Sequence, residues 1–161
     1  MRWIMFDSFN FIDVENGKAQ AKRGITRAED IFEDTFNFQP IFPPVLLIEM
    51  IAQTGGVLVG AVINFSKEII LGKIDWARFP NEILPPAVLV IDAWITDKSE
   101  DGTRIEGKIT ADGKTLCEAS ILLGHLGRLE TGLLDGQESV VFNDLFLSSF
   151  KIKELLGASV R

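Results

Sequence analysis

This chain of 161 residues is 47% hydrophobic and 24% charged, with twelve Phe and three Trp, which is the composition of one globular domain with a sizeable core. Its formal net charge of -7 argues against binding to nucleic acid, because that affinity depends on Lys and Arg replacing the counterions of phosphate. One Cys and one His exclude an intramolecular disulfide and any Cys/His zinc spacing, so we expect neither a metal nor a cofactor.

The N-terminal residues lack the basic stretch and apolar run of a secretory signal, and acidic Asp7 and Asp13 come early. We therefore expect a cytoplasmic protein. Between residues 6 and 26, two strand-like runs flank Asn16-Gly17, a dipeptide that readily takes the positive φ angles of a tight turn. This pattern predicts a β-hairpin.

The residues from Thr26 to Glu29 have the capping-box pattern of a helix start, which predicts a short helix ending near Phe32. After an irregular segment, Pro43-Pro44 opens the most apolar run of the chain, 45–65. Proline is tolerated in a first helical turn because its missing N–H would have no partner within the helix. We predict one long helix there.

From residue 69 onward the pattern changes to strands separated by prolines, Asp101-Gly102 and Asp112-Gly113. The predicted strands are 69–79, 84–97, 104–111 and 115–125. One hairpin, one long helix and four strands predict an α+β fold in which a single antiparallel sheet wraps around the helix. We assign residues 1–126 to this domain and 127–161 to a C-terminal tail, which the spacing of its apolar residues predicts to be helical from about residue 140.

The long helix 45–65 has 21 residues and one charge, so by length it could also span a bilayer. Gly56 and Gly60 even have the small-residue spacing of paired membrane helices. The helix has no basic flanks, however, and the strands need an apolar helix to cover their inner face. We therefore predict a buried core helix and no membrane span.

Glu49 is the residue that a buried core helix leaves unexplained, because an ionised carboxylate in apolar surroundings costs several kcal/mol unless it is paired. Gln53 lies one turn later on the same face. The two side chains could together point into a cleft or a subunit interface. An acid in a cleft is a candidate general acid or base, whereas a Glu hydrogen-bonded to a strand or a second subunit would be structural.

The run PIFPPVLLIEMIAQ at 40–53 resembles the helix-opening motif of the bacterial 3-hydroxyacyl-acyl-carrier-protein dehydratases. The resemblance continues in GKID at 72–75, in ARF at 77–79, and in DGK and LCEA at 112–114 and 116–119. It covers about residues 6–126. It implies the hotdog fold, a homodimer or higher homo-oligomer, and a tunnel at the subunit interface that admits a substrate carried on phosphopantetheine. Glu49 takes the position of that family's catalytic acid.

Two parts of the family's site are missing from this sequence. The glycine-histidine-phenylalanine-proline-glycine segment, which carries the catalytic base, has no counterpart before Pro40. Pro44 replaces the glycine whose N–H polarises the thioester carbonyl, and only the amide of Val45 could substitute for it. His125 is the one imidazole in the chain, and it follows Glu49 by 76 residues at the end of the last strand.

The resemblance also suggests which residues bind the substrate. Asn37 and Gln39 are the polar groups nearest to the missing histidine, and either could orient a thioester or a water molecule. Gln53, one turn after Glu49, and the Val45 amide at the start of the helix are the other polar groups expected to contact the substrate. Phe42 and Trp76 are expected to set the depth of the tunnel.

Three functions remain open from the sequence. The first is an acyl-thioester-binding protein whose dehydratase activity is weak or lost, because the base and the carbonyl donor are absent. The second is an active hotdog enzyme using Glu49, either a thioesterase or a (3R)-hydroxyacyl dehydratase. The third is an interaction protein without a ligand. An acyl carrier protein is a possible partner, provided that basic residues gather locally to offset the acidic charge.

Overall fold

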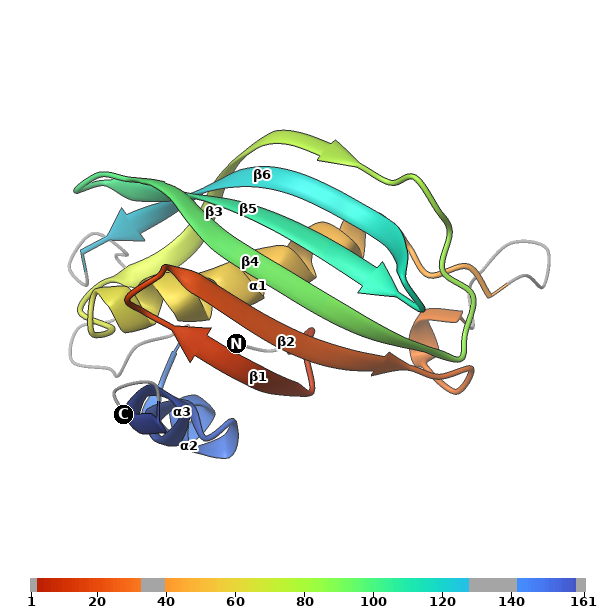
Figure 1. Ribbon diagram of the computed structural model, residues 1–161, viewed down its shortest axis with the longest axis horizontal. Coiled ribbons are helices and arrows are strands. Elements are labelled where there is room, and N and C mark those ends of the chain that lie inside the picture. The colour runs from red at the N-terminus through yellow and green to blue at the C-terminus, as the bar shows by residue number, and fades with distance from the viewer. Residues whose placement is uncertain (1–2, 33–39, 128–141, 159–161) are drawn as a thin grey trace.

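The chain folds into a six-stranded antiparallel sheet that curls around one long helix, as Figure 1 shows. The computed structural model describes residues 3–32, 40–127 and 142–158. The order of strands across the sheet is β1-β2-β4-β5-β6-β3, and every neighbouring pair is antiparallel. The predicted α+β hotdog architecture is confirmed.

The elements follow the predicted order. They are β1 (Ser8–Asp13), β2 (Lys18–Ile25), the short 3-10 helix η1 (Asp30–Phe32), α1 (Val45–Val62), β3 (Glu68–Arg78), β4 (Ala87–Lys98), β5 (Gly102–Ala111), β6 (Lys114–Leu126), α2 (Asp144–Ser149) and α3 (Ile152–Ala158). Strand β4 begins three residues later than predicted, because Pro85 and Pro86 have no N–H to donate to a neighbouring strand. The expected tight turns form where Gly17, Asp112 and Gly113 take positive φ angles of 62°, 48° and 75°.

A row of small residues crosses the sheet directly beneath α1. The hydrogen-bonded register places Ala19, Ala93, Gly107 and Ala119 side by side on β2, β4, β5 and β6. A Cβ atom on Gly107 would collide with the side chain of Ile51, and one on Gly55 would lie 2.9 Å from Cγ2 of Ile105. The row therefore lets the helix lie unusually close to the sheet.

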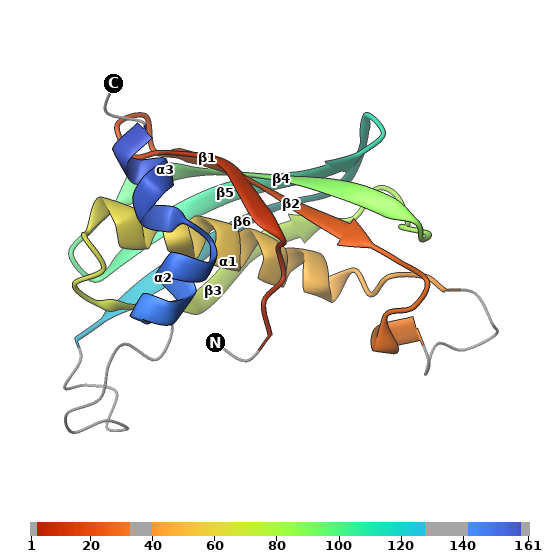
Figure 2. The same ribbon diagram turned by 90° about the horizontal axis from the view of Figure 1, so that it is seen from below.

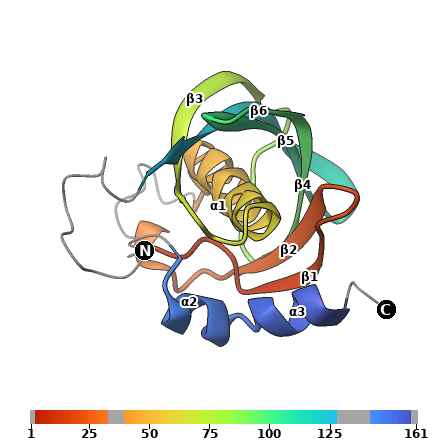
Figure 3. The same ribbon diagram turned by 90° about the vertical axis from the view of Figure 1, so that its left-hand side faces the viewer.

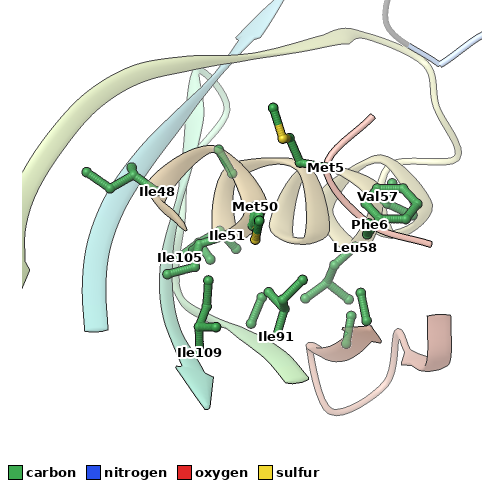
Figure 4. Packing of buried hydrophobic residues seen from close by; sticks show 14 of the residues in the cluster. Met5, Phe6, Ile48, Met50, Ile51, Val57, Leu58, Ile91, Ile105 and Ile109 are labelled. Carbon is green, nitrogen blue, oxygen red and sulfur yellow. The ribbon is translucent and has the colours of Figure 1, made fainter. Parts of the chain in front are cut away.

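The core lies between α1 and the concave face of the sheet. Figure 4 shows Ile51 and Leu58 of the helix pointing toward Ile91, Ile105 and Ile109 of β4 and β5. All five side chains are buried. Although α1 is long and apolar enough to cross a membrane, 78% of it is buried inside the fold, as expected for a core helix.

Helix α1 ends three residues before the predicted limit at Phe65. Asn64 and Phe65 adopt positive φ angles of 52° and 51°, which break the helix. The turn carries the Phe65 ring back over the helix, so that a Cβ on Gly60 would lie only 2.6 Å from the ring. Glycine at this position is thus required by the turn and its aromatic ring.

The C-terminal extension forms two short helices rather than one continuous helix. Lys151, with a positive φ of 53°, separates α2 from α3. The side chain of Asn143 caps α2 by accepting a hydrogen bond from the Phe146 amide at 2.8 Å. Figures 2 and 3 show α3 beside β1, and Figure 3 shows both helices on the side of the molecule away from β3 and β6. Residues 140 and 141, where the helix was predicted to begin, lie outside the described residues.

Candidate functional site

Glu49 lies in the second turn of α1 and is half-buried. Its carboxylate Oε1 accepts a hydrogen bond of 2.8 Å from Nε2 of Gln53. The two side chains therefore share one face of the helix, as the spacing of four residues predicts. The carboxylate has a polar neighbour although the rest of the helix is apolar.

Gln53 also fastens the N-terminal segment, residues 3–7, to α1. Its Nε2 donates to the carbonyl oxygen of Trp3 at 2.7 Å, and its Oε1 accepts from the amide of Met5 at 2.8 Å. The side chain is only 4% exposed. Gln53 was predicted to bind substrate, but its amide group is already engaged by the chain, so contact with a ligand would require it to exchange these bonds.

A small cavity of about 90 Å³ lies beside the Glu49 carboxylate. Apart from Glu49 and Gln53, its walls are apolar or lack a side chain. They come from α1, from the first half of β3, from β6 and from the C-terminal extension: Ala52, Gly56, Ile69, Ile70, Leu71, Leu123 and Phe142. The acid thus faces a narrow apolar space.

A larger cavity of about 750 Å³ lies at the other side of the N-terminal segment. Trp3, Ile4 and Met5 form one wall, and η1 with the start of α1 forms another. Phe42, predicted to line the substrate tunnel, lines this cavity. An ion pair between Arg23 Nη2 and Glu29 Oε2, 2.7 Å long, lies at its edge.

The start of α1 offers one amide that could act on a ligand carbonyl. Pro44 has no N–H, and the amides of Leu46 and Leu47 donate to the carbonyl oxygens of Pro43 and Pro44 at 3.1 and 3.0 Å. Neither bond uses the amide of Val45, whose side chain is 65% exposed. The prediction that Val45 could replace the missing donor is compatible with this geometry and stays a prediction.

The remaining predicted residues are not brought together with Glu49. Asn37 and Gln39 lie outside the described residues. Trp76 is exposed on β3, where the guanidinium carbon of Arg78 lies 4.9 Å from the centre of its ring. It is not among the residues that line the two cavities described above, so its predicted role in the tunnel stays a prediction.

His125 takes part in a network at the end of the sheet. Its Nε2 lies 3.0 Å from the hydroxyl of Thr103, and its Nδ1 lies 3.2 Å from the carbonyl oxygen of Glu100. It pairs with Ile69, near the start of β3. Both ring nitrogens therefore serve the turn between β4 and β5.

Two other groups bear on the chemistry that the chain can perform. Burial raises the pKa of the Cys117 thiol to about 12, with a smaller contribution from the charge of Glu118, so Cys117 is no thiolate nucleophile at neutral pH. Within residues 3–32, 40–127 and 142–158, no three His, Cys, Asp or Glu side chains gather closely enough to hold a metal ion.

Sequence reasoning missed two parts of this site, the N-terminal segment and Phe142. The signal for Phe142 was present in Gly56 and Gly60, whose spacing marks a helix face that another group approaches closely. The Phe142 ring lies 3.3 Å from where a Cβ of Gly56 would stand. The glycine that faces the sheet is Gly55, next to Ile105.

Comparison with known proteins decides the family. The model of the FabA-like domain matches residues 4–120, most of the chain. The chain belongs to the FabA-like family. Among FabA-like relatives, the 3-hydroxyacyl-[acyl-carrier-protein] dehydratase FabZ of Pasteurella multocida is 36% identical over 114 residues, which cover 69% of this chain and 75% of that enzyme. The FabZ of Listeria welshimeri is 33% identical over 113 residues, covering 69% and 78%.

Solved structures show the same fold at lower sequence identity. The dehydratase heterocomplex ApeI:P from Xenorhabdus doucetiae matches with a TM-score of 0.65 and 20% identity, covering 83% of this chain and 90% of that one. A hypothetical thioesterase with coenzyme A from Streptococcus pneumoniae TIGR4 matches with a TM-score of 0.60 and 12% identity, covering 76% and 89%. The resemblance to the fatty-acid-synthesis dehydratases noted in the sequence is confirmed.

Proposed function

We propose that this FabA-like protein binds acyl thioesters carried on phosphopantetheine and that its dehydratase activity is weak or lost. The proposal rests on the positions of Glu49 and His125, the acid and the imidazole that dehydration would need, because the structure does not bring them to one site. Glu49 lies beside an apolar cavity, whereas the only imidazole of the chain, His125, has both ring nitrogens in contact with Thr103 and Glu100.

Dehydration of a 3-hydroxyacyl thioester removes a proton next to the carbonyl and expels the β-hydroxyl as water, so it needs a base and an acid. Glu49 can serve as one of them. His125 pairs with Ile69 at the end of the sheet, where its ring nitrogens contact Thr103 and Glu100, and it is not among the residues that line the Glu49 cavity. Within one subunit His125 is therefore a poor base, and loss of general-base catalysis costs about 10²–10⁴ in rate.

The half-buried Glu49 carboxylate on an apolar cavity favours a second candidate, an active hotdog enzyme. Glu49 would act as base or nucleophile in a thioesterase, or as the acid of a hydro-lyase with an unusual base. A third possibility is an interaction protein without a ligand, in which Glu49 and Gln53 only lock the dimer. These candidates differ in whether a thioester binds and in which product it gives.

The direct test is to incubate the purified chain with 3-hydroxybutyryl-coenzyme A and to follow both the enoyl product and free thiol. We expect binding by calorimetry with little or no turnover of either kind. Enoyl product that disappears in Glu49→Gln would overturn the loss of dehydration, and Glu49-dependent release of thiol would establish a thioesterase. Failure of any acyl thioester to bind would leave the interaction protein.

We further propose that two copies of the chain pair through β3. This strand lies at the edge of the sheet, and it exposes apolar side chains along its length: Ile70, Leu71, Ile74 and Trp76 are 39–44% exposed. An open edge with exposed apolar residues is a site for pairing with another strand. We also propose a cytoplasmic location.

An acyl carrier protein is the proposed partner. Lys73 and Arg78 on β3 would supply the positive charges that attract this acidic protein.

Light scattering of the Ile74→Lys variant tests the pairing. We expect the wild-type chain to have the mass of a dimer or a higher oligomer and the variant to have the mass of a monomer. Val88→Lys is the matched control, because Val88 is 63% exposed at the start of β4, away from this edge. A wild-type monomer would contradict the proposal, and so would an oligomer that Ile74→Lys leaves unchanged.

A further inference from the structure

The cavity beside Glu49 ends at a residue of the C-terminal extension. Phe142 comes just before α2, yet it lines the same cavity as Glu49, Gln53 and Gly56. The FabA-like match ends at residue 120, so Phe142 belongs to a part of the chain outside that match. A side chain outside the matched region therefore completes the wall of the candidate site.

The Phe142 ring is held firmly in this position. It is 5% exposed, and its ring centre lies 5.9 Å from that of Phe65 and 5.4 Å from that of Phe146. It lies against Gly56 and Gly60, whose missing side chains make the room that the ring occupies. The Asn143 cap fixes the start of α2 immediately after it. These contacts leave the ring little freedom to swing out of the cavity.

The size of the cavity limits what can lie next to Glu49. Its volume of about 90 Å³ is far below the roughly 300–1,000 Å³ of pockets that hold larger ligands. An apolar cavity of roughly 150 Å³ binds benzene, which has six carbons. By that scale, the space beside Glu49 holds about four carbons, and the Phe142 ring forms part of its wall.

We propose that Phe142 is a specificity-determining residue that restricts the ligand to short acyl thioesters of about four carbons. This inference rests on the proposed function, in which the acyl group lies beside Glu49. The C-terminal extension then sets the chain length by closing the Glu49 cavity beside Gly56. Replacing the Phe142 ring with a methyl group would enlarge this cavity for a longer acyl chain.

The test measures affinity for butyryl-, hexanoyl-, octanoyl- and decanoyl-coenzyme A by calorimetry, using the full chain. We expect wild-type affinity to be highest for butyryl-coenzyme A and to fall as the chain lengthens. In Phe142→Ala, the affinity for octanoyl relative to butyryl should rise at least tenfold, because each newly buried methylene contributes about a fourfold gain.

Phe150→Ala is the matched control. Phe150 belongs to the same aromatic cluster, 5.1 Å from Phe146 and 4.9 Å from Phe6, but it does not line the Glu49 cavity. The Phe150→Ala substitution should weaken the packing of the C-terminal extension without changing the preference for the length of the acyl chain. An equal change in both variants would overturn the role of the Phe142 ring. If Phe142→Ala fails to fold, Phe142→Leu decides by the same ratio, with a smaller rise expected.

The outcomes separate this inference from the function on which it rests. If no thioester binds to the wild-type chain, the proposed function fails and the inference fails with it. If the wild-type chain binds all four thioesters equally well, or if the octanoyl-to-butyryl ratio is the same in Phe142→Ala and wild type, the inference alone is overturned. Acyl-thioester binding would then stand.

Discussion

The two faces of helix α1 are packed in different ways. The face toward the sheet meets a row of small residues, and there Gly55 and Gly107 take up the side chains of Ile105 and Ile51. The opposite face carries Glu49 and Gln53 and is covered by the two ends of the chain. Hydrogen bonds and aromatic rings hold this cover in place, and cavities remain beneath it.

The sheet side of α1 is therefore the rigid scaffold, whereas the side covered by the two ends of the chain can accept changes in side-chain size. On the sheet side, helix and strands fit by shape alone, so each position tolerates little change in volume. On the other side, the N-terminal segment and Phe142 are added to the helix by a few specific contacts. Changes there alter the cavity beside Glu49 without rebuilding the sheet.

The largest expected effect is on the sheet face. Gly107→Val would place a branched side chain where Ile51 already lies, with the carbonyl oxygen of Asp92 only 3.1 Å from the new Cβ. We expect the free energy of unfolding in urea to fall by about 3 kcal/mol. Gly157→Ala in α3, where a Cβ would meet nothing within 4 Å, should instead be neutral or stabilising. Equal effects of the two variants would contradict the tight fit.

A smaller loss is expected where α1 meets the N-terminal segment. Gln53→Leu leaves the Met5 amide and the Trp3 carbonyl without their present partner, which should lower the free energy of unfolding by about 1–3 kcal/mol. Hydrogen exchange of the Met5 amide should speed up as a local sign of the loss. Asn81→Leu, which removes one exposed bond to the Thr115 carbonyl, is the control and should cost less. Unchanged exchange at Met5 would rule out the fastening role.

The exclusion of water from the packed interior of the sheet can be tested through Cys117, which is buried on β6. Its pKa is raised from 9.0 to about 12 by burial, so the unfolded chain loses the thiol proton first as the pH rises. The stability is therefore complete below pH 9 and falls between pH 9 and about 12, by up to about 1.4 kcal/mol for each pH unit. Urea unfolding at pH 8 and 10 should show this slope in the wild type and less of it in Cys117→Ala. If the free energy of unfolding changed equally with pH in the wild type and in Cys117→Ala, water would reach the thiol in the folded protein.

The smallest effect on stability is expected at Asp75 on β3, away from both faces of α1. Lys73 and Arg104 hold the pKa of Asp75 below its usual value of 3.8, through hydrogen bonds and charge. A lowered pKa stabilises the fold above about pH 4, and this contribution disappears as the pH falls through the folded value. The difference in stability between wild type and Asp75→Asn should thus shrink between pH 6 and pH 3. A difference that stays constant over this pH range would contradict the coupling of Asp75 to Lys73 and Arg104.

Much of the fold could be predicted from the sequence because its signals are local. The Asn16-Gly17 and Asp112-Gly113 turns, the alternating strands and the apolar helix each depend on neighbouring residues. The early end of α1 was missed because Asn64 and Phe65 take left-handed angles that no local pattern requires. The break at Lys151 was missed for the same reason.

The site was harder to predict, since it depends on residues far apart in the chain. The pairing of Glu49 with Gln53 follows from helical spacing and was anticipated. The approach of Trp3 and Met5 to Gln53, across about fifty residues, has no sequence signal. The row of small residues under α1 exists only through the register of β2, β4, β5 and β6. Phe142 was assigned only to the C-terminal tail, which was predicted to be helical from about residue 140.

The two edges of the sheet are unlike, and this limits how copies of the chain can assemble. Helix α3 packs against β1 at one edge, whereas β3 at the other edge is open and apolar. Pairing of β3 with β3 uses the same surface in both copies and leaves neither with a second open edge. If the proposed pairing forms, growth through this edge would stop at a closed pair of sheets, and the exposed apolar strand would not start a filament.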